Sequence, residues 1–144
     1  MHQQQAEAFM REAISEGRKA IAKCAPNPPV GCVLVRDGKI ISRGHTNAPG
    51  QPHAEAMALY QLQGKLDDVI AFVTLEPCSF QGRTPSCAIE LITRGVKQVY
   101  VGIIDPHPNN RGAGIAMLKQ AGICVHLGIL EAEIKNALEP YLIK

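Results

Sequence analysis

Four side chains in the middle of the chain could together carry out metal-assisted chemistry. His53 and Glu55 stand in the segment HAE, and Cys78 and Cys87 follow, separated by the eight residues SFQGRTPS. A neutral imidazole and two thiolates suit Zn²⁺, and three protein ligands leave the fourth tetrahedral position open for water. Because paired zinc cysteines usually stand two to four residues apart, the longer interval is either accidental or a loop with a role of its own.

Glu55 is the candidate proton carrier at such a site. Residues i and i+2 of an ideal helix point to nearly opposite sides, so spacing alone does not bring Glu55 to a water held beside His53. Cys87 stands near the first turn of the segment PSCAIELI, and a helix N-terminus favours thiolate over thiol. The pattern predicts a catalytic metal centre. The alternative is a structural zinc module, which would need a fourth protein ligand such as His107 or Cys32 and would leave Glu55 without a purpose.

Composition favours one compact globular domain over residues 1–144 and a small polar substrate. The chain has 46% hydrophobic and 19% charged residues, and its formal charge of +2 comes without any run of Lys or Arg. Neither nucleic acid nor a membrane surface is therefore an expected partner. The N-terminus lacks the apolar core of a signal peptide, and no window approaches the roughly 18 apolar residues of a membrane helix. We expect a cytoplasmic protein.

Five cysteines are an odd number, and a reducing compartment disfavours disulfides. The thiols are therefore expected to be core residues or metal ligands. Cys24, Cys32 and Cys124 stand in apolar or helix-breaking surroundings and are predicted to pack in the interior.

The periodicity of the chain predicts how these residues are positioned. Apolar residues at helical spacing between Ala6 and Ile21 indicate a first helix that ends before APNPP, and VGCVLVRDGKIISRG predicts a hairpin turning at Asp37 and Gly38. Helices are then expected over residues 53–63, 85–95, 114–122 and 130–142, and strands over 69–75, 96–104 and 123–129. Such alternation predicts a parallel sheet with an antiparallel hairpin at one end, in a three-layer α/β/α sandwich with a five-stranded mixed sheet.

This arrangement brings the four reactive residues together. His53 and Glu55 begin a helix just after a loop, Cys78 follows the carboxyl end of a buried strand, and Cys87 starts the next helix. Ligands of open α/β sheets bind at that edge.

The motif HAE, followed by PC and a later Cys, resembles the zinc-dependent cytidine deaminase superfamily, whose pattern is H-x-E with P-C-x-x-C. The longer interval in PCSFQGRTPSC is similar to the pyrimidine deaminase of riboflavin biosynthesis. APNPPVGCVLV, GHTNAPGQPHAE, TLEPC, DPHP and LKQAGICV resemble segments of that family in the same order. The resemblance implies a cytidine deaminase-like fold and a Zn²⁺ cofactor held by His53, Cys78 and Cys87.

The same resemblance implies an enzyme, a zinc-dependent hydrolase that removes an amino group from a diaminopyrimidinone carrying a phosphoribosylamino arm. Glu55 would take the proton of the attacking water and deliver it to the ring nitrogen and then to the leaving amine. Backbone groups near Ala54 and the Asn27 side chain would hold the ring. Arg83 could bind the phosphate, and Asp105 could accept hydrogen bonds from ribose hydroxyls. Two further residues are candidate substrate contacts: Phe80 and His45.

Three departures from the family pattern lie on the sugar-phosphate side. Phe80 stands where His is common, His107 stands where D-P-N-P has Asn, and Ala113 occupies the middle of the later G-[RK]-G. They leave open a deaminase of another free base, nucleoside or nucleotide, such as cytosine or guanine. A tRNA-editing deaminase would predict the short P-C-x-x-C and a basic face, neither of which is present.

The riboflavin enzyme usually carries a fused reductase domain. If this chain acts in the riboflavin pathway, we expect a separate reductase as partner; the alternative is a different substrate. The resemblance also implies a homo-oligomer, a dimer or a tetramer. Glu76 in TLEPC is expected to hold its loop by hydrogen bonds rather than to take part in chemistry.

Overall fold

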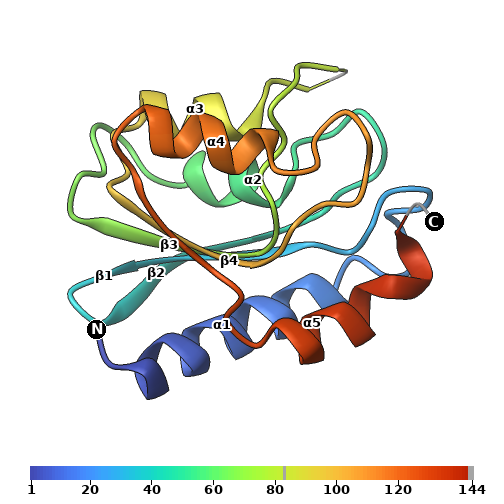
Figure 1. Cartoon of the computed structure of the whole chain (residues 1–144), viewed down its shortest axis with the longest axis horizontal. Coiled ribbons are helices and arrows are strands. Elements are labelled where there is room, and N and C mark those ends of the chain that lie inside the picture. The colour runs from blue at the N-terminus through green and yellow to red at the C-terminus, as the bar shows by residue number, and fades with distance from the viewer. Residues whose placement is uncertain (83, 143–144) are drawn as a thin grey trace.

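The sheet is built from a hairpin and three parallel strands, in the order β2-β1-β3-β4-β5. β1 pairs antiparallel with both neighbours, whereas β3, β4 and β5 run parallel to one another. The computed structural model describes residues 1–82 and 84–142, and Figure 1 shows the whole chain. The strand bounds are β1 (Gly31–Arg36), β2 (Lys39–His45), β3 (Val69–Leu75), β4 (Gln98–Ile103) and β5 (Cys124–Leu127).

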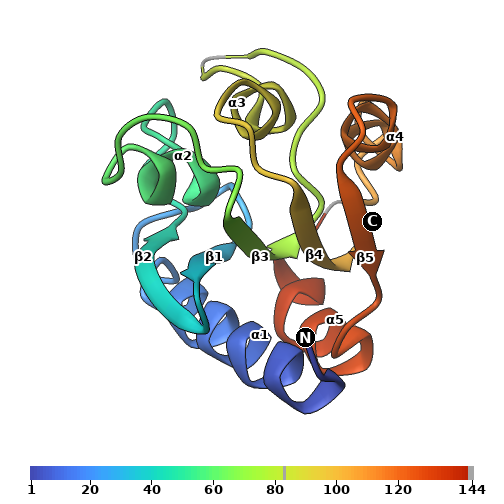
Figure 2. The same cartoon turned by 90° about the vertical axis from the view of Figure 1, so that its left-hand side faces the viewer.

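Helices cover both faces of this sheet. On one face lie α1 (Gln3–Arg18) and α5 (Glu131–Leu138); on the other lie α2 (Ala54–Leu59), α3 (Cys87–Thr93) and α4 (Ala113–Gln120) (Figure 2). A 3-10 turn, η1 (Glu139–Tyr141), follows α5. The predicted three-layer sandwich with five mixed strands is confirmed. In the described part of the chain, no helix combines the length and apolar character needed to cross a membrane.

The hairpin turns where the sequence predicts it. Asp37 and Gly38 have φ angles of 51° and 75°, and positive values at both central residues match the twist of the flanking strands. Residues that accept φ > 0 at low cost are thus placed where the turn needs them.

Two helices end four residues before the predicted position, residue 59 against 63 and residue 138 against 142. α2 ends at Leu59 rather than at residue 63. Beyond this end, the Arg94 guanidinium donates three hydrogen bonds of 2.7–3.0 Å, to the carbonyls of Leu59, Leu62 and Gly64. These carbonyls are therefore satisfied without a continued helix. The last predicted helix ends at Leu138, just before the Pro-containing turn η1.

The core lies on both faces of the central strands. Phe72 of β3 is fully buried, and its ring stacks on Tyr100 with centroids 4.6 Å apart. Cys24 and Cys32 are buried, as predicted, whereas the expectation for Cys124 is wrong. Its side chain is exposed because β5 is an edge strand of the sheet.

Candidate active site

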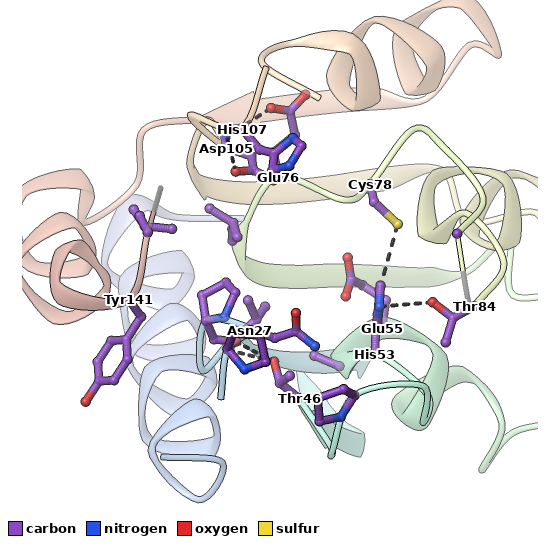
Figure 3. A pocket seen from close by; sticks show the side chains of 18 of the residues that line it. Asn27, Thr46, His53, Glu55, Glu76, Cys78, Thr84, Asp105, His107 and Tyr141 are labelled. Carbon is purple, nitrogen blue, oxygen red and sulfur yellow. Dashed lines mark hydrogen bonds between the residues drawn. The ribbon is translucent and has the colours of Figure 1, made fainter. Parts of the chain in front are cut away.

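His53 and Glu55 reach one cavity because only Glu55 belongs to the helix. His53 is the N-cap of α2, with an extended backbone at φ −71° and ψ 173°, and Glu55 is the second helical residue. The opposite directions expected for positions i and i+2 of a continuous helix therefore do not apply here. Both side chains line the same cavity, as Figure 3 shows.

A glycine allows the start of α2 to lie close to the sheet. A Cβ on Gly44 of β2 would collide with the carbonyl oxygen of Ala54 and would lie 2.8 Å from the backbone nitrogen of Ala58. Any larger residue would push the helix away from the strand. The position of His53 and Glu55 therefore depends on residue 44 being a glycine.

The two cysteines are neighbours despite the eight residues between them. Cys78 follows β3, and Cys87 is the first residue of α3. The backbone N–H of Cys87 donates to the Cys78 sulfur at 3.2 Å. The Ser86 hydroxyl and the Ala88 N–H both donate to the Cys78 carbonyl, at 2.8 and 3.1 Å. These bonds join the two ends of the connecting loop.

Three donor atoms converge at this point. His53 Nδ1 lies 3.4 Å from the Cys87 sulfur and 3.8 Å from the Cys78 sulfur, and all three candidate ligand atoms lie within 4.8 Å of one another. One imidazole nitrogen and two sulfurs fit zinc, and they form the donor set of a site with an open fourth position. Neither His107 nor Cys32 belongs to this group within the residues that the structure describes.

The electrostatics of the two thiols differ from the expectation. The hydrogen bond with Cys87, reinforced by His53, lowers the pKa of Cys78 to about 5 despite burial, while the same hydrogen bond and burial raise the pKa of Cys87 well above its ordinary value. The backbone N–H at the start of α3 points to the Cys78 sulfur. The backbone N–H at the start of α3 thus favours the thiolate at Cys78, whereas the sequence pointed to Cys87.

Glu55 lies almost completely out of contact with solvent, with 4% of its surface exposed. Burial, and after it the negative charge of Cys78, raise the pKa of this carboxyl to about 7. It is a buried acid in the wall of the cavity, next to the three donor atoms.

The cavity has a volume of about 590 Å³, which lies in the range of small-molecule sites. Four of the predicted substrate contacts line it: Asn27, Ala54, Phe80 and Asp105. His107 lines it as well, with its ring centroid 6.0 Å from that of Phe80. The two aromatic residues at which the chain departs from the family pattern therefore meet in one wall.

The other two predicted contacts are Arg83 and His45. Arg83 lies outside the described residues. His45 is buried and is not among the described residues that line the cavity; its Nδ1 lies 2.7 Å from the Glu16 carboxylate. Its neighbour Thr46 does line the cavity, and its hydroxyl accepts from the Val30 N–H at 2.9 Å. His45 thus anchors the end of β2 rather than facing the cavity.

Glu76 ties together two loops beside the cavity. One carboxylate oxygen accepts from the backbone N–H groups of Asp105 and Gly112, at 3.1 and 2.9 Å, and the other accepts from Ile115 at 3.0 Å. The prediction that this residue holds its loop by hydrogen bonds is confirmed. The bonds fix Asp105 at the cavity and the start of α4 beside it.

Sequence reasoning missed several residues of the site. Asn110 is buried, accepts from the Ser79 N–H at 3.1 Å and contacts the Asp105 carboxylate at 3.4 Å. No local pattern distinguishes it from its exposed neighbour Asn109. Two residues that sequence reasoning missed, Thr84 and Tyr141, line the cavity itself. Of these, only Thr84 stands in a candidate functional segment, SFQGRTPS.

The α/β/α fold, with a His/Cys/Cys donor group beside a buried Glu, defines a deaminase-like class of protein. Residues 3–103 match the family model described as the cytidine and deoxycytidylate deaminase zinc-binding region. The chain belongs to this family.

Riboflavin biosynthesis proteins are among its relatives. The chain is 46% identical over 134 residues to the riboflavin biosynthesis protein RibD of Chlamydia pneumoniae, which covers 93% of this chain and 36% of the relative. It is 43% identical to the chloroplastic PYRD protein of Zea mays, over 93% of this chain and 34% of that protein. The chain spans about a third of the length of these curated relatives.

Solved structures agree with this relationship. RibD of Acinetobacter baumannii matches with a TM-score of 0.90 and 40% identity, over 99% of this chain and 40% of that one. The dCMP deaminase of cyanophage S-TIM5, in apo form, matches with a TM-score of 0.67 and 27% identity, over 88% of this chain and 99% of that one. The predicted cytidine deaminase-like fold is confirmed.

Proposed function

We propose that the chain is a zinc-dependent hydrolase that deaminates an aminopyrimidine, the diaminopyrimidinone of riboflavin biosynthesis with its phosphoribosylamino arm. The observation that carries the proposal is the donor group of His53, Cys78 and Cys87, of which His53 and Cys78 line the same cavity as Glu55. A Thermotoga maritima structure supports the substrate; it matches with a TM-score of 0.88 and 39% identity and is named as a diaminohydroxyphosphoribosylaminopyrimidine deaminase and a reductase.

In this proposal His53 Nδ1 and the sulfurs of Cys78 and Cys87 hold the metal. When bound, zinc lowers the pKa of a coordinated water toward about 7 and so supplies a nucleophile near neutral pH. Glu55 accepts one proton from the attacking water and delivers it to the ring nitrogen. It then takes the second proton, from the new hydroxyl on the ring carbon, and passes it to the amino group, which leaves as ammonia while the carbonyl forms. The burial of Glu55 keeps bulk water away from the carboxyl during these transfers.

The proposal gives each part of the substrate to particular residues. Asn27 and the backbone at Ala54 hold the pyrimidine ring, and both residues line the cavity. Asp105 accepts hydrogen bonds from the ribose hydroxyls, and Phe80 packs on the arm. Arg83, taken from the sequence alone, binds the phosphate. A separate reductase, a homo-oligomer of two or four chains and the action of residues 1–144 as one domain belong to the same proposal.

Metal content and turnover test the chemistry. The purified chain should hold about one zinc, and Cys87→Ala should lose most of it. Glu55→Gln should keep the zinc while turnover falls by roughly 10² to 10⁴. The matched control is Glu133→Gln, an exposed carboxyl, and should behave as wild type. A wild type without metal ends the proposal, and a Glu55→Gln enzyme within threefold of wild type moves the proton carrier elsewhere.

A panel of substrates tests the identity of the base. Ammonia release should be fastest with the phosphorylated diaminopyrimidinone, and faster than with cytosine, guanine or their nucleosides. Arg83→Ala should lower kcat/KM for the phosphorylated compound, which corresponds to a loss of about 1.5 to 3 kcal/mol of transition-state stabilisation. The kcat/KM for the dephosphorylated compound should not change. If the wild type had equal kcat/KM for the two compounds, the enzyme would not recognise the phosphate.

A further inference from the structure

The loop between Cys78 and Cys87 brings a hydroxyl to the far edge of the His53 ring. The Thr84 Oγ1 lies 3.0 Å from His53 Nε2, whereas Nδ1 faces the Cys78 sulfur (Figure 3). Nδ1 also lies 3.4 Å from the Cys87 sulfur. The ring is thus contacted through both of its nitrogens. One edge meets the donor group and the other meets the loop.

The two contacts together select one form of the imidazole. A neutral ring carries a single N–H, and a nitrogen that binds a metal must be free of its proton. With Nδ1 as the ligand atom, the proton stays on Nε2, and the Nε2–H donates a hydrogen bond to the Thr84 hydroxyl oxygen. Such a partner on the second nitrogen sets both the tautomer and the orientation of the ring.

The connecting loop is built to place Thr84. Its two ends are held together by the Ser86 and Ala88 hydrogen bonds to the Cys78 carbonyl, and the Gly82 N–H donates to the Thr84 carbonyl at 3.2 Å. A P-C-x-x-C motif has only two residues between its cysteines. The longer interval here includes Thr84, whose hydroxyl lies at the Nε2 edge of the ring.

We propose that Thr84 is a positioning residue for the metal centre, which holds His53 in the tautomer and orientation that a zinc ligand needs. The inference rests on the proposed zinc site and adds to it. It also gives the long interval between the cysteines a role before any substrate binds. A competing role is open to Thr84, because it lines the cavity and could contact the substrate only.

Zinc affinity measured without substrate separates these roles. Thr84→Val keeps the shape of the side chain and removes the hydroxyl, and it should weaken zinc binding by about 10- to 100-fold in competition with a chromogenic chelator. Thr84→Ser should stay within about threefold of wild type. The matched control is Thr93→Val, at an exposed position on α3, and should leave zinc affinity unchanged.

A spectroscopic readout reports the hydrogen bond itself. In zinc-loaded, ¹⁵N-labelled protein, the His53 Nε2–H should give a resonance protected from exchange with water in wild type and in Thr84→Ser. In Thr84→Val this protection should be lost. If the valine variant does not fold, Thr84→Ala carries the same comparison with less bulk.

The outcomes distinguish this inference from the function on which it rests. A wild type that binds no zinc overturns the proposed function. A wild type that binds zinc, with valine and alanine variants of equal affinity and a protected Nε2–H, overturns only the role of Thr84. A loss confined to the KM for substrate would also overturn it, because it would assign the hydroxyl to substrate binding.

Discussion

Replacing Glu76 by Gln should destabilise the protein and misplace one wall of the cavity. The Glu76 carboxylate is 3% exposed and accepts three backbone hydrogen bonds, from Asp105, Gly112 and Ile115. The amide oxygen of Gln can replace only one carboxylate oxygen. Its NH₂ group then faces a backbone N–H, so one buried donor is left without an acceptor.

The magnitude follows from these three bonds. Leaving the Ile115 N–H unpaired costs about 1 to 3 kcal/mol, and the two remaining bonds lose the strength that the charge gives them. We expect a loss of about 2 to 4 kcal/mol in the free energy of unfolding. At about 2 to 4 °C per kcal/mol for a chain of this size, the melting temperature should fall by about 4 to 16 °C.

Thermal and urea unfolding of Glu76→Gln and wild type measure this loss, with the exposed Glu133→Gln as control. The KM for the aminopyrimidine should rise more than kcat falls, because the Asp105 loop is displaced while the donor group is not. The reasoning is refuted if Glu76→Gln and Glu133→Gln melt within 1 °C of each other, on the order of the error of the method.

Three further perturbations test the packing around the site. Burial opposes the ionisation of Glu16, but the hydrogen bond with His45 and the contacts of Lys19 lower its pKa in net. The stabilising effect of ionised Glu16 is therefore present above the unfolded pKa of about 4.3 and is lost as pH falls through the lower folded pKa. Below about pH 4.3, the urea midpoint should fall more steeply for wild type than for Glu16→Gln. Parallel curves would contradict this. Arg94→Lys carries its three N–H donors on a single nitrogen, which cannot reach all three carbonyls as the guanidinium does. Urea unfolding should therefore show a loss of about 1 to 3 kcal/mol, and an unchanged midpoint would argue against the capping role. Gly44→Ala should force α2 away from β2, at a cost of at least about 1 to 3 kcal/mol and with weaker zinc binding in the chelator assay; wild-type affinity would show that the strand yields instead.

Local chemistry explains which parts of the fold could be predicted. The hairpin turn needs only Asp37 and Gly38, and β3 has the predicted bounds, residues 69–75, because a run of apolar residues indicates a strand buried on both faces. The end of α2 could not be predicted, because the guanidinium that satisfies its carbonyls comes from Arg94, more than thirty residues later. Helix boundaries set by such distant contacts leave no local signal.

The same distinction holds for the site. The residue types of His53, Cys78 and Cys87 identify a candidate zinc centre from the sequence because few other residues bind that metal. Asn110 and Thr84 reach their partners across 31 residues, and nothing in the neighbouring sequence indicates where these two common side chains point. The anchoring of His45 by Glu16 likewise depends on how α1 packs beside β2.

The exposed position of Cys124 has a practical consequence. Among the described thiols, those of Cys24, Cys32 and Cys87 are buried and that of Cys78 is half-buried, so Cys124 is the most accessible to a bulky maleimide reagent. A dye attached there would sit on the edge strand β5, away from the donor group at the start of α3. Labelling Cys124 first, and counting the thiols that react after a chelator is added, would report how tightly the metal protects the other cysteines.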